Sequence, residues 1–416
     1  MKDKINNIAG KIFNRKSEKM IKVKISTKIK KKLFTLKTNN YEYLGMEEAP
    51  KTKKIRNPGI DLGRILSMYA IIIHHILAHG KAIGKYTQYA NELNAMNIIY
   101  HWHVSAFIFI SGYVGYKTCK YSNLLYLWLC TSFYLAGINI YFNKFKPNIY
   151  KKEITYQSFF PVLNFKYWYF TVYFAMYLFL PVINKGIENI SKYQLRLVVI
   201  SLILVYIILK DYINPNLDSF QFNCNSVVWF LIYFMTGAYF GKFKQEISWI
   251  KKIIYCSLYI FIYYYSTYLC INLPNYQIQN EQSIKGRFII FLKSIFTVKL
   301  NSFTMILQSA SIILFLTTIN YNKYIAKVIT FIGPLTYGIY IIHEHDIIRQ
   351  KFIINTFQNY SSNLPLNSIK KIIYLKALKI FVACAIIEYL RNLLFRILFI
   401  RKICILFEKL IFILLG

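Results

Sequence analysis

Acidic residues are scarce in this chain of 416 residues, which has 17 Asp and Glu against 52 Lys and Arg. Charged residues of both signs make up only 17% of the sequence, while hydrophobic residues make up 56%. Disordered and low-complexity proteins have the opposite balance, because they cannot bury enough apolar surface to offset the loss of chain entropy. The composition therefore excludes those classes.

The sequence also lacks the motifs of common soluble enzymes and metal centres. It contains no P-loop and no GxGxxG, HExxH or GxSxG motif. The seven cysteines are scattered, their number is odd, and no two have CxxC spacing. We interpret them as small apolar residues of buried helices and expect no disulfide framework, no zinc site and no other bound metal.

Long apolar runs dominate the remainder of the chain. At least nine stretches are long and apolar enough to cross a bilayer. Ten spans of ~20 residues each would use about 200 residues, roughly half the chain. The sequence therefore predicts an all-α integral membrane protein, a bundle of about ten transmembrane helices. The predicted spans are 60–79, 97–116, 124–143, 167–186, 195–213, 226–241, 250–272, 302–320, 329–348 and 371–397.

About a third of the net charge of +35 falls in the first 56 residues, which hold 17 Lys and Arg against 5 Asp and Glu. Such an excess is typical of cytoplasmic segments and attracts anionic lipid headgroups. It also suggests nucleic acid, but membrane orientation explains it better, so no nucleic-acid partner is expected. We predict a multi-pass protein of the cell membrane with a basic cytoplasmic tail (1–56), a transmembrane domain (57–400) and an apolar C-terminal tail (401–416).

One loop conflicts with this topology. With ten spans both ends of the chain lie in the cytoplasm, and the four short loops that then face inward all carry Lys. The predicted outer loop 214–225 has no Lys or Arg, as expected, whereas the predicted outer loop 144–166 holds five lysines. The segment from Phe288 to Phe296 is shorter, and we interpret it as an interfacial or re-entrant helix.

The first predicted span carries an unusual set of ionisable residues. Eleven residues turn an α-helix by ~1100°, so Arg64 and His75 share one face, about 16 Å apart. His79 lies one turn beyond His75, whereas His74 points elsewhere. Ionisable groups are costly inside a membrane, which makes this stripe a candidate functional site. The alternative is that Arg64 extends to the headgroups and Asp61 merely pairs with it.

Three other spans carry aromatic and titratable groups. The segment 101–103 reads His-Trp-His, which is typical of an interfacial belt, and its two histidines lie ~200° apart on one helix, too far round to bind a metal together. Trp168, Tyr169 and Tyr173 also fit an aromatic belt. The ninth span ends in a polar group, predicted to lie on the outer side, in which one turn separates His345 from Arg349.

Four segments, in order along residues 56–400, resemble the acyltransferase 3 family of membrane acyltransferases. The first runs from Asp61 through Arg64 to His75, with ten residues between the Arg and the His. The second is the sequence FIFISGY at 107–113, and the third is the aromatic span 168–184. The fourth is the sequence YGIYIIH at 337–343.

The resemblance implies a ten-span helical fold that moves an acyl group, usually acetyl from acetyl-CoA, onto a hydroxyl of a glycan or lipid-linked sugar. The family often carries an Arg-x-x-Arg motif where the third span begins, but residues 120–126 of this chain contain no Arg. Lys117 and Lys120 would then supply point charges for the phosphates of the donor.

The resemblance also suggests roles for individual residues. His75 would act as general base on the sugar hydroxyl, or less favourably as a transient acyl carrier. Arg64, held by Asp61, would orient the donor. The residues expected to contact the substrates are Trp168, Tyr169, Tyr173, His343, His345 and Arg349.

Two other functions fit the same residues. Buried Arg and His also mark proton-coupled transport, so a transporter, flippase or polymerase of polysaccharide intermediates is an alternative. A membrane cytochrome is another, because His75, His103 and His343 come from different spans and are potential haem ligands.

Overall fold

The computed structural model describes residues 56–117, 119–145, 159–163, 166–213, 226–243, 248–272 and 302–415, with 286, 291 and 300 as isolated positions. Apart from Arg56, these described residues belong to one compact unit, Asn57–Gly416, and they contain helices but no strand. The predicted basic tail, apart from Arg56, and most of the predicted re-entrant segment lie outside the described residues.

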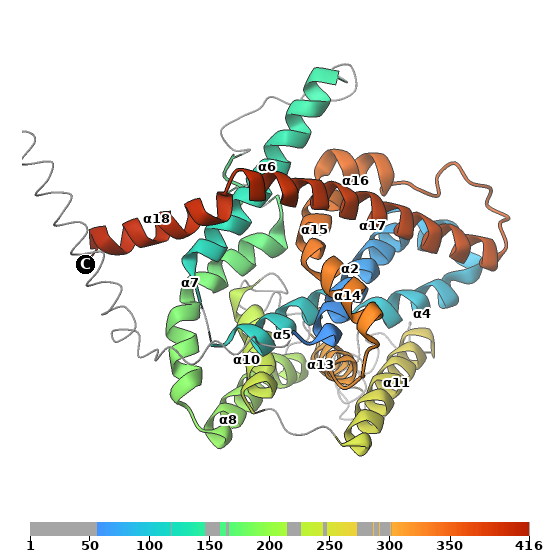
Figure 1. The fold of residues 1–416 in the computed structure, drawn as a ribbon. Helices are drawn as coiled ribbons and strands as arrows, with labels where there is room; N and C mark the ends of the chain where they lie inside the picture. The colour runs from blue at the N-terminus through green and yellow to red at the C-terminus, as the bar shows by residue number, and fades with distance from the viewer. Residues whose placement is uncertain are drawn as a thin grey trace, which may run out of the picture. The chain divides into compact units, whose positions relative to one another are not determined.

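The α-helices follow one another along the chain, and Figure 1 labels all of them except α3 and α9. They are α2 (Pro58–Ala78), α3 (Ala82–Lys85), α4 (Ala90–Tyr100), α5 (His103–Gly115), α6 (Tyr121–Phe145), α7 (Trp168–Asn189), α8 (Lys192–Ile203), α9 (Lys210–Ile213), α10 (Val227–Lys242), α11 (Trp249–Asn272), α13 (Phe303–Thr317), α14 (Lys323–Ile332), α15 (Thr336–Glu344), α16 (Asp346–Phe352), α17 (Leu366–Ile397) and α18 (Ile400–Leu415).

Every predicted span falls on one or more of these helices. Five helical stretches in the described residues are long and apolar enough to cross a membrane, which confirms the all-helical membrane class. They are Pro58–Lys85, Tyr121–Phe145, Trp168–Asn189, Lys192–Leu209 and Lys323–Glu344. The count of about ten spans stays a prediction. The span 97–116 was predicted as one helix, but the chain turns between α4 and α5 at residues 101 and 102.

Helix α2 lies among α4, α5, α13, α14, α15 and α17 (Figure 1). Asn57 caps its start by accepting a hydrogen bond from the Gly59 amide at 2.8 Å, and Pro58 occupies the first helical position. Large apolar side chains such as Met68, Ile72 and Ile76 are buried in the surrounding core. This position makes α2 the element that presents the polar stripe to its neighbours.

A break between α14 and α15 fits against the start of α2. The chain forms a short 3₁₀ turn at Gly333–Leu335, and the side chain of the fully buried Asp61 lies against Gly333. A Cβ atom at residue 333 would lie only 2.6 Å from the Asp61 Cβ. The glycine therefore allows the acidic side chain to sit at the break.

Buried polar groups attach α17 to α6. Glu388 and Arg391 pair in the core, and Glu388 Oε2 accepts a hydrogen bond from the Tyr134 hydroxyl at 2.7 Å. Arg391 also donates to the Tyr126 hydroxyl at 2.8 Å. An ionised group left without its partner in such surroundings would be costly, so the pair fixes the position of the long helix.

Helices α5 and α10 approach each other closely through glycines. A Cβ at Gly112 would lie 1.9 Å from the Phe234 carbonyl oxygen, and one at Gly237 would lie 2.0 Å from that of Phe109. Small residues permit this backbone contact, which is common between helices in membranes. The contact fixes the second half of α5, from Phe109 to Tyr113, against α10.

We expect Gly237→Ala to destabilise the protein by about 1–3 kcal/mol, because the added methyl forces the two backbones apart. Gly137→Ala is the matched control, since a Cβ at residue 137 in α6 would meet no atom within 4 Å. There the smaller entropy loss of alanine should leave the unfolding temperature in detergent equal or higher. Equal unfolding temperatures for the two variants would contradict the close approach.

Candidate functional site

The seven histidines of the chain come from three segments and gather in one region. Ring centroids of successive neighbours lie 5.2 to 5.7 Å apart, from His79 to His75 and then to His74 and His343. His101 and His103 extend the group beyond His74, and His345 directly follows Glu344. Histidine is thus concentrated at the C-terminal end of α2.

His75 and Glu344 form the centre of this region. The Nδ1 atom of His75 lies 2.7 Å from Oε1 of Glu344, and the two side chains are 15% and 12% exposed. A carboxylate at Nδ1 favours the tautomer with its proton on that atom, so Nε2 keeps its lone pair. The arrangement can therefore take up a proton at Nε2 and stabilise the resulting imidazolium.

Arg349 lies on the other side of the same carboxylate. Its Nη1 atom lies 3.6 Å from Oε2 of Glu344, and its Nη2 atom donates to Nε2 of His79 at 2.7 Å. The guanidinium thus stabilises the carboxylate and orients His79 at the end of α2.

His343 is fully buried beside these groups. It donates from Nδ1 to the Ile339 carbonyl at 2.7 Å, and its Nε2 lies 3.8 Å from Oε1 of Glu344. The structure therefore brings His343 and Arg349 to His75, as the sequence predicts. Glu344 was not among the predicted site residues, although an acid at the end of an apolar span is itself a sign of function.

His345 has a local structural role. It is buried and precedes α16, where its Nδ1 accepts a hydrogen bond from the Ile347 amide at 3.4 Å. Next to it, Asp346 pairs with Lys166 at 2.7 Å. His345 thus caps the helix that carries Arg349, and a part in substrate contact stays a prediction.

Arg64 lies in the second turn of α2, and its side chain is 26% exposed. It donates to Oδ1 of Asp61 at 2.8 Å, which agrees with the predicted pair. It also lies close enough to Tyr169 and Tyr173 to interact electrostatically with their hydroxyl groups. Arg64 is therefore close to the aromatic span, and its extension to the headgroups stays the alternative.

Aromatic rings connect the surroundings of Arg64 to the histidines. Tyr169 stacks on Tyr173 at 6.1 Å and contacts Trp168 at 6.0 Å. It also meets Tyr340 on α15 at 5.8 Å, and Tyr340 in turn contacts His343 at 6.3 Å. Of the three aromatic residues predicted from the third motif, Tyr169 thus reaches α15, while Trp168 contacts Phe230 on α10.

Lys117 and Lys120 lie at the opposite end of α2, in the connection between α5 and α6. Both side chains are exposed, and the Tyr177 hydroxyl donates to the Lys120 carbonyl at 3.0 Å. Just before Lys117, the Tyr116 hydroxyl donates to the Gly241 carbonyl at 3.3 Å. The two lysines therefore lie near the C-terminal end of α10.

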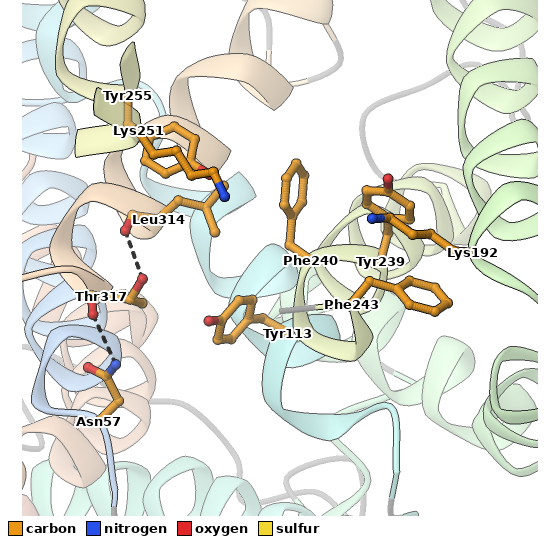
Figure 2. A pocket seen from close by; sticks show the side chains of 10 residues that line it. All are labelled: Asn57, Tyr113, Lys192, Tyr239, Phe240, Phe243, Lys251, Tyr255, Leu314 and Thr317. Atoms are coloured by element: carbon orange, nitrogen blue, oxygen red, sulfur yellow. Dashed lines mark hydrogen bonds between the residues drawn. The ribbon is translucent and has the colours of Figure 1, made fainter. Parts of the chain in front are cut away.

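A pocket of about 260 Å³ opens at this same end. Figure 2 shows Lys251 and Tyr255 on one side of it and Lys192 beside Tyr239 on the other. Asn57, which caps α2, also lines it and donates to the Thr317 carbonyl at 3.2 Å. The described residues that line it are Asn57, Tyr113, Lys192, Tyr239, Phe240, Phe243, Lys251, Tyr255, Leu314 and Thr317. Aromatic walls with two cations suit a ligand that has an anionic group and a flat ring.

The interfacial interpretation of residues 101–103 is wrong. His101 is 8% exposed and His103 only 2%, and both rings contact His74. The separation of ~200° assumed a single helix. The turn between α4 and α5 removes this angular separation, and the ring centroids of His101 and His103 lie 5.5 Å apart.

Comparison with known proteins confirms the resemblance seen in the four motifs. A family model described as an acyltransferase domain matches residues 57–390, more than three quarters of the chain. No curated protein and no solved structure matches the chain.

Proposed function

The chain belongs to the acyltransferase 3 family, and on that premise we propose that it transfers an acetyl group from acetyl-CoA to a hydroxyl of a cell-surface polysaccharide or lipid-linked sugar. The observation that carries the proposal is the contact of 2.7 Å between His75 and Glu344. This pair supplies a base and the carboxylate that orients it, which is what the transfer to a hydroxyl requires.

In this proposal His75 acts as general base. Its Nε2 takes the proton of the sugar hydroxyl while the oxygen attacks the thioester carbonyl. The tetrahedral intermediate then expels the CoA thiolate, and the imidazolium returns the proton to the sulfur. Glu344 stabilises the charged imidazolium, and general base catalysis of this kind typically contributes ~100- to 10,000-fold.

Neighbouring groups would position the acceptor. His343 donates from Nδ1 to a backbone carbonyl, so its Nε2 can accept a hydrogen bond from a sugar hydroxyl. Arg349 keeps Glu344 in place and contacts the exposed side chain of His79. The acceptor would therefore approach from the end of α2 at which His79 lies.

The donor would bind at the other end of α2. The exposed Lys117 and Lys120 lie there, together with the pocket lined by Lys192 and Lys251. These cations suit the phosphates of CoA. If the N-terminal tail is cytoplasmic, as we propose from its charge, this end faces the compartment that holds acetyl-CoA.

Replacing His75 by Gln should lower the rate of acetyl transfer by ~100- to 10,000-fold, because the amide keeps a polar group but cannot accept the proton. Radiolabelled acetyl-CoA is supplied to membranes with a competent acceptor, and label in the glycan fraction is counted. The amount of each variant in the membrane is the control. Full transfer by H75Q at native protein levels would rule out the general-base role.

Glu344→Gln should lower kcat while leaving KM for acetyl-CoA unchanged. The amide can still hold His75 by a hydrogen bond, but it no longer stabilises the imidazolium, and it lies far from the proposed donor end. Initial rates at varied acetyl-CoA concentration separate the two parameters. A raised KM with native kcat would place Glu344 in donor binding instead.

The double variant Lys117→Gln/Lys120→Gln should raise KM for acetyl-CoA roughly tenfold with little change in kcat, since it removes charge-assisted contacts with phosphate. Lys371→Gln is the matched control, because it changes an exposed lysine on α17 outside the proposed donor end. Equal KM values for the two variants would remove both lysines from the donor site and leave the pocket lysines as the alternative.

A further inference from the structure

We propose that His74, His101 and His103 form a binding site for one divalent transition-metal ion of the Zn²⁺ type. This inference does not depend on the proposed acetyl transfer. It departs from the expectation of no metal, which rested on cysteine spacing and on the assumption that His101 and His103 share one helix. The site joins α2 to the junction of α4 and α5.

The three imidazoles are close enough to share an ion. Their ring centroids lie 5.2, 5.3 and 5.5 Å apart, and one possible ligand atom from each residue lies within 4.8 Å of the others. Zn–N bonds of ~2.0–2.1 Å place the nitrogens of a tetrahedral site about 3.3 Å apart. Small side-chain rotations would close this difference.

Two of the three rings carry a buried nitrogen atom that has no hydrogen bond to any described residue. Nδ1 of His101 and Nε2 of His103 are buried and have no hydrogen-bond partner among the described residues. Buried polar atoms are rarely left in that state, and each such case calls for a bound water, ion or other group. A metal ion at the centre of the three rings provides the missing partner for both.

The surroundings of His74 already resemble those of a metal ligand. Its Nδ1 donates to Oδ1 of Asn97 at 2.7 Å, which leaves the lone pair of Nε2 available. A second hydrogen bond of this kind fixes the tautomer and orientation of most metal-binding histidines. Asn97 is therefore a positioning residue for the site.

His103 must change its tautomer on binding. Its Nδ1 accepts a hydrogen bond from the Val104 amide at 2.7 Å, which places the proton on Nε2. Metal binding at Nε2 moves that proton to Nδ1 and releases the amide. The amide belongs to the first turn of α5, where backbone donors have no partner within the helix.

The ligand set determines the kind of ion. Three neutral imidazoles suit Zn²⁺, Cu²⁺ or Ni²⁺, whereas Mg²⁺ and Ca²⁺ require oxygen ligands. Three protein ligands also leave a fourth position for water. Because the rings of His74 and His75 lie 5.7 Å apart, an ion here would also place positive charge beside the proposed base.

A second set of possible ligands is less suitable. His75, His343 and Glu344 have comparable spacing and also carry buried atoms without a hydrogen bond, but the carboxylate lies 2.7 Å from the His75 ring as an ion pair and faces Arg349 at 3.6 Å. The guanidinium repels a second cation at that position. Among the described residues, the partners of the three-histidine set are other histidines, Asn97 and the Val104 amide, with no Lys or Arg, which favours it as the metal site.

The test uses the full chain, purified in detergent with a tag that contains no histidine. Zn²⁺ is titrated into protein treated with a chelator, and bound metal is counted by elemental analysis. We expect one ion per native chain, at least 100-fold weaker binding in His101→Gln and His103→Gln, and 10- to 100-fold weaker binding in Asn97→Ala. Glu344→Gln, which removes the second set, should bind like the native chain.

The identity of the ligands is tested separately on the native protein, so that a variant that fails to fold does not decide the result. Cu²⁺ is bound in place of Zn²⁺, and pulsed electron paramagnetic resonance counts the coordinated imidazoles. Three imidazoles support the proposal. Two imidazoles with loss of binding in E344Q would assign the ion to the second set, and the absence of stoichiometric binding would also overturn the proposal.

Discussion

The contact between Glu344 and His75 constrains the whole region, because an unpaired carboxylate inside an apolar bundle is very costly. It requires the end of α15 to lie beside the last turn of α2. At the other end of this segment, the side chain of Asp61 lies against Gly333, where α14 gives way to α15. Acidic groups thus attach the broken helix to α2 at two levels, and the break itself makes both contacts possible.

Helical periodicity made part of this site predictable. Local spacing predicts the pairing of Arg64 with Asp61, and the structure contains that pair. The four motifs also pointed to His343, which lies in contact with His75. These results depend on residues within one helix or on a pattern shared with a family. Neither helical spacing nor the family pattern predicts which parts of two different helices are in contact.

The remaining features depend on contacts between distant segments. The turn at residues 101 and 102 contains neither Gly nor Pro, so no local sequence pattern predicts it. The predicted orientation of His103 was wrong for that reason. Glu388 and Arg391 show a different limit. The rule that ionisable residues inside spans are functional or paired identifies both residues, but Tyr134, the partner of Glu388, lies 254 positions earlier.

The two ends of α2 differ in chemistry, and the length of the helix separates them. From Asn57 to His75 there are 18 residue steps, which span ~27 Å and approach the thickness of a bilayer core. Lysines and a pocket lie at the first end, and the histidines lie at the second. If the charged part of the donor stays among the lysines, its acyl group has to reach His75 from within the bundle. Arg64 and the rings of Tyr169 and Tyr340 lie between the two ends. They are therefore the side chains that the acyl-bearing part of the proposed donor would pass.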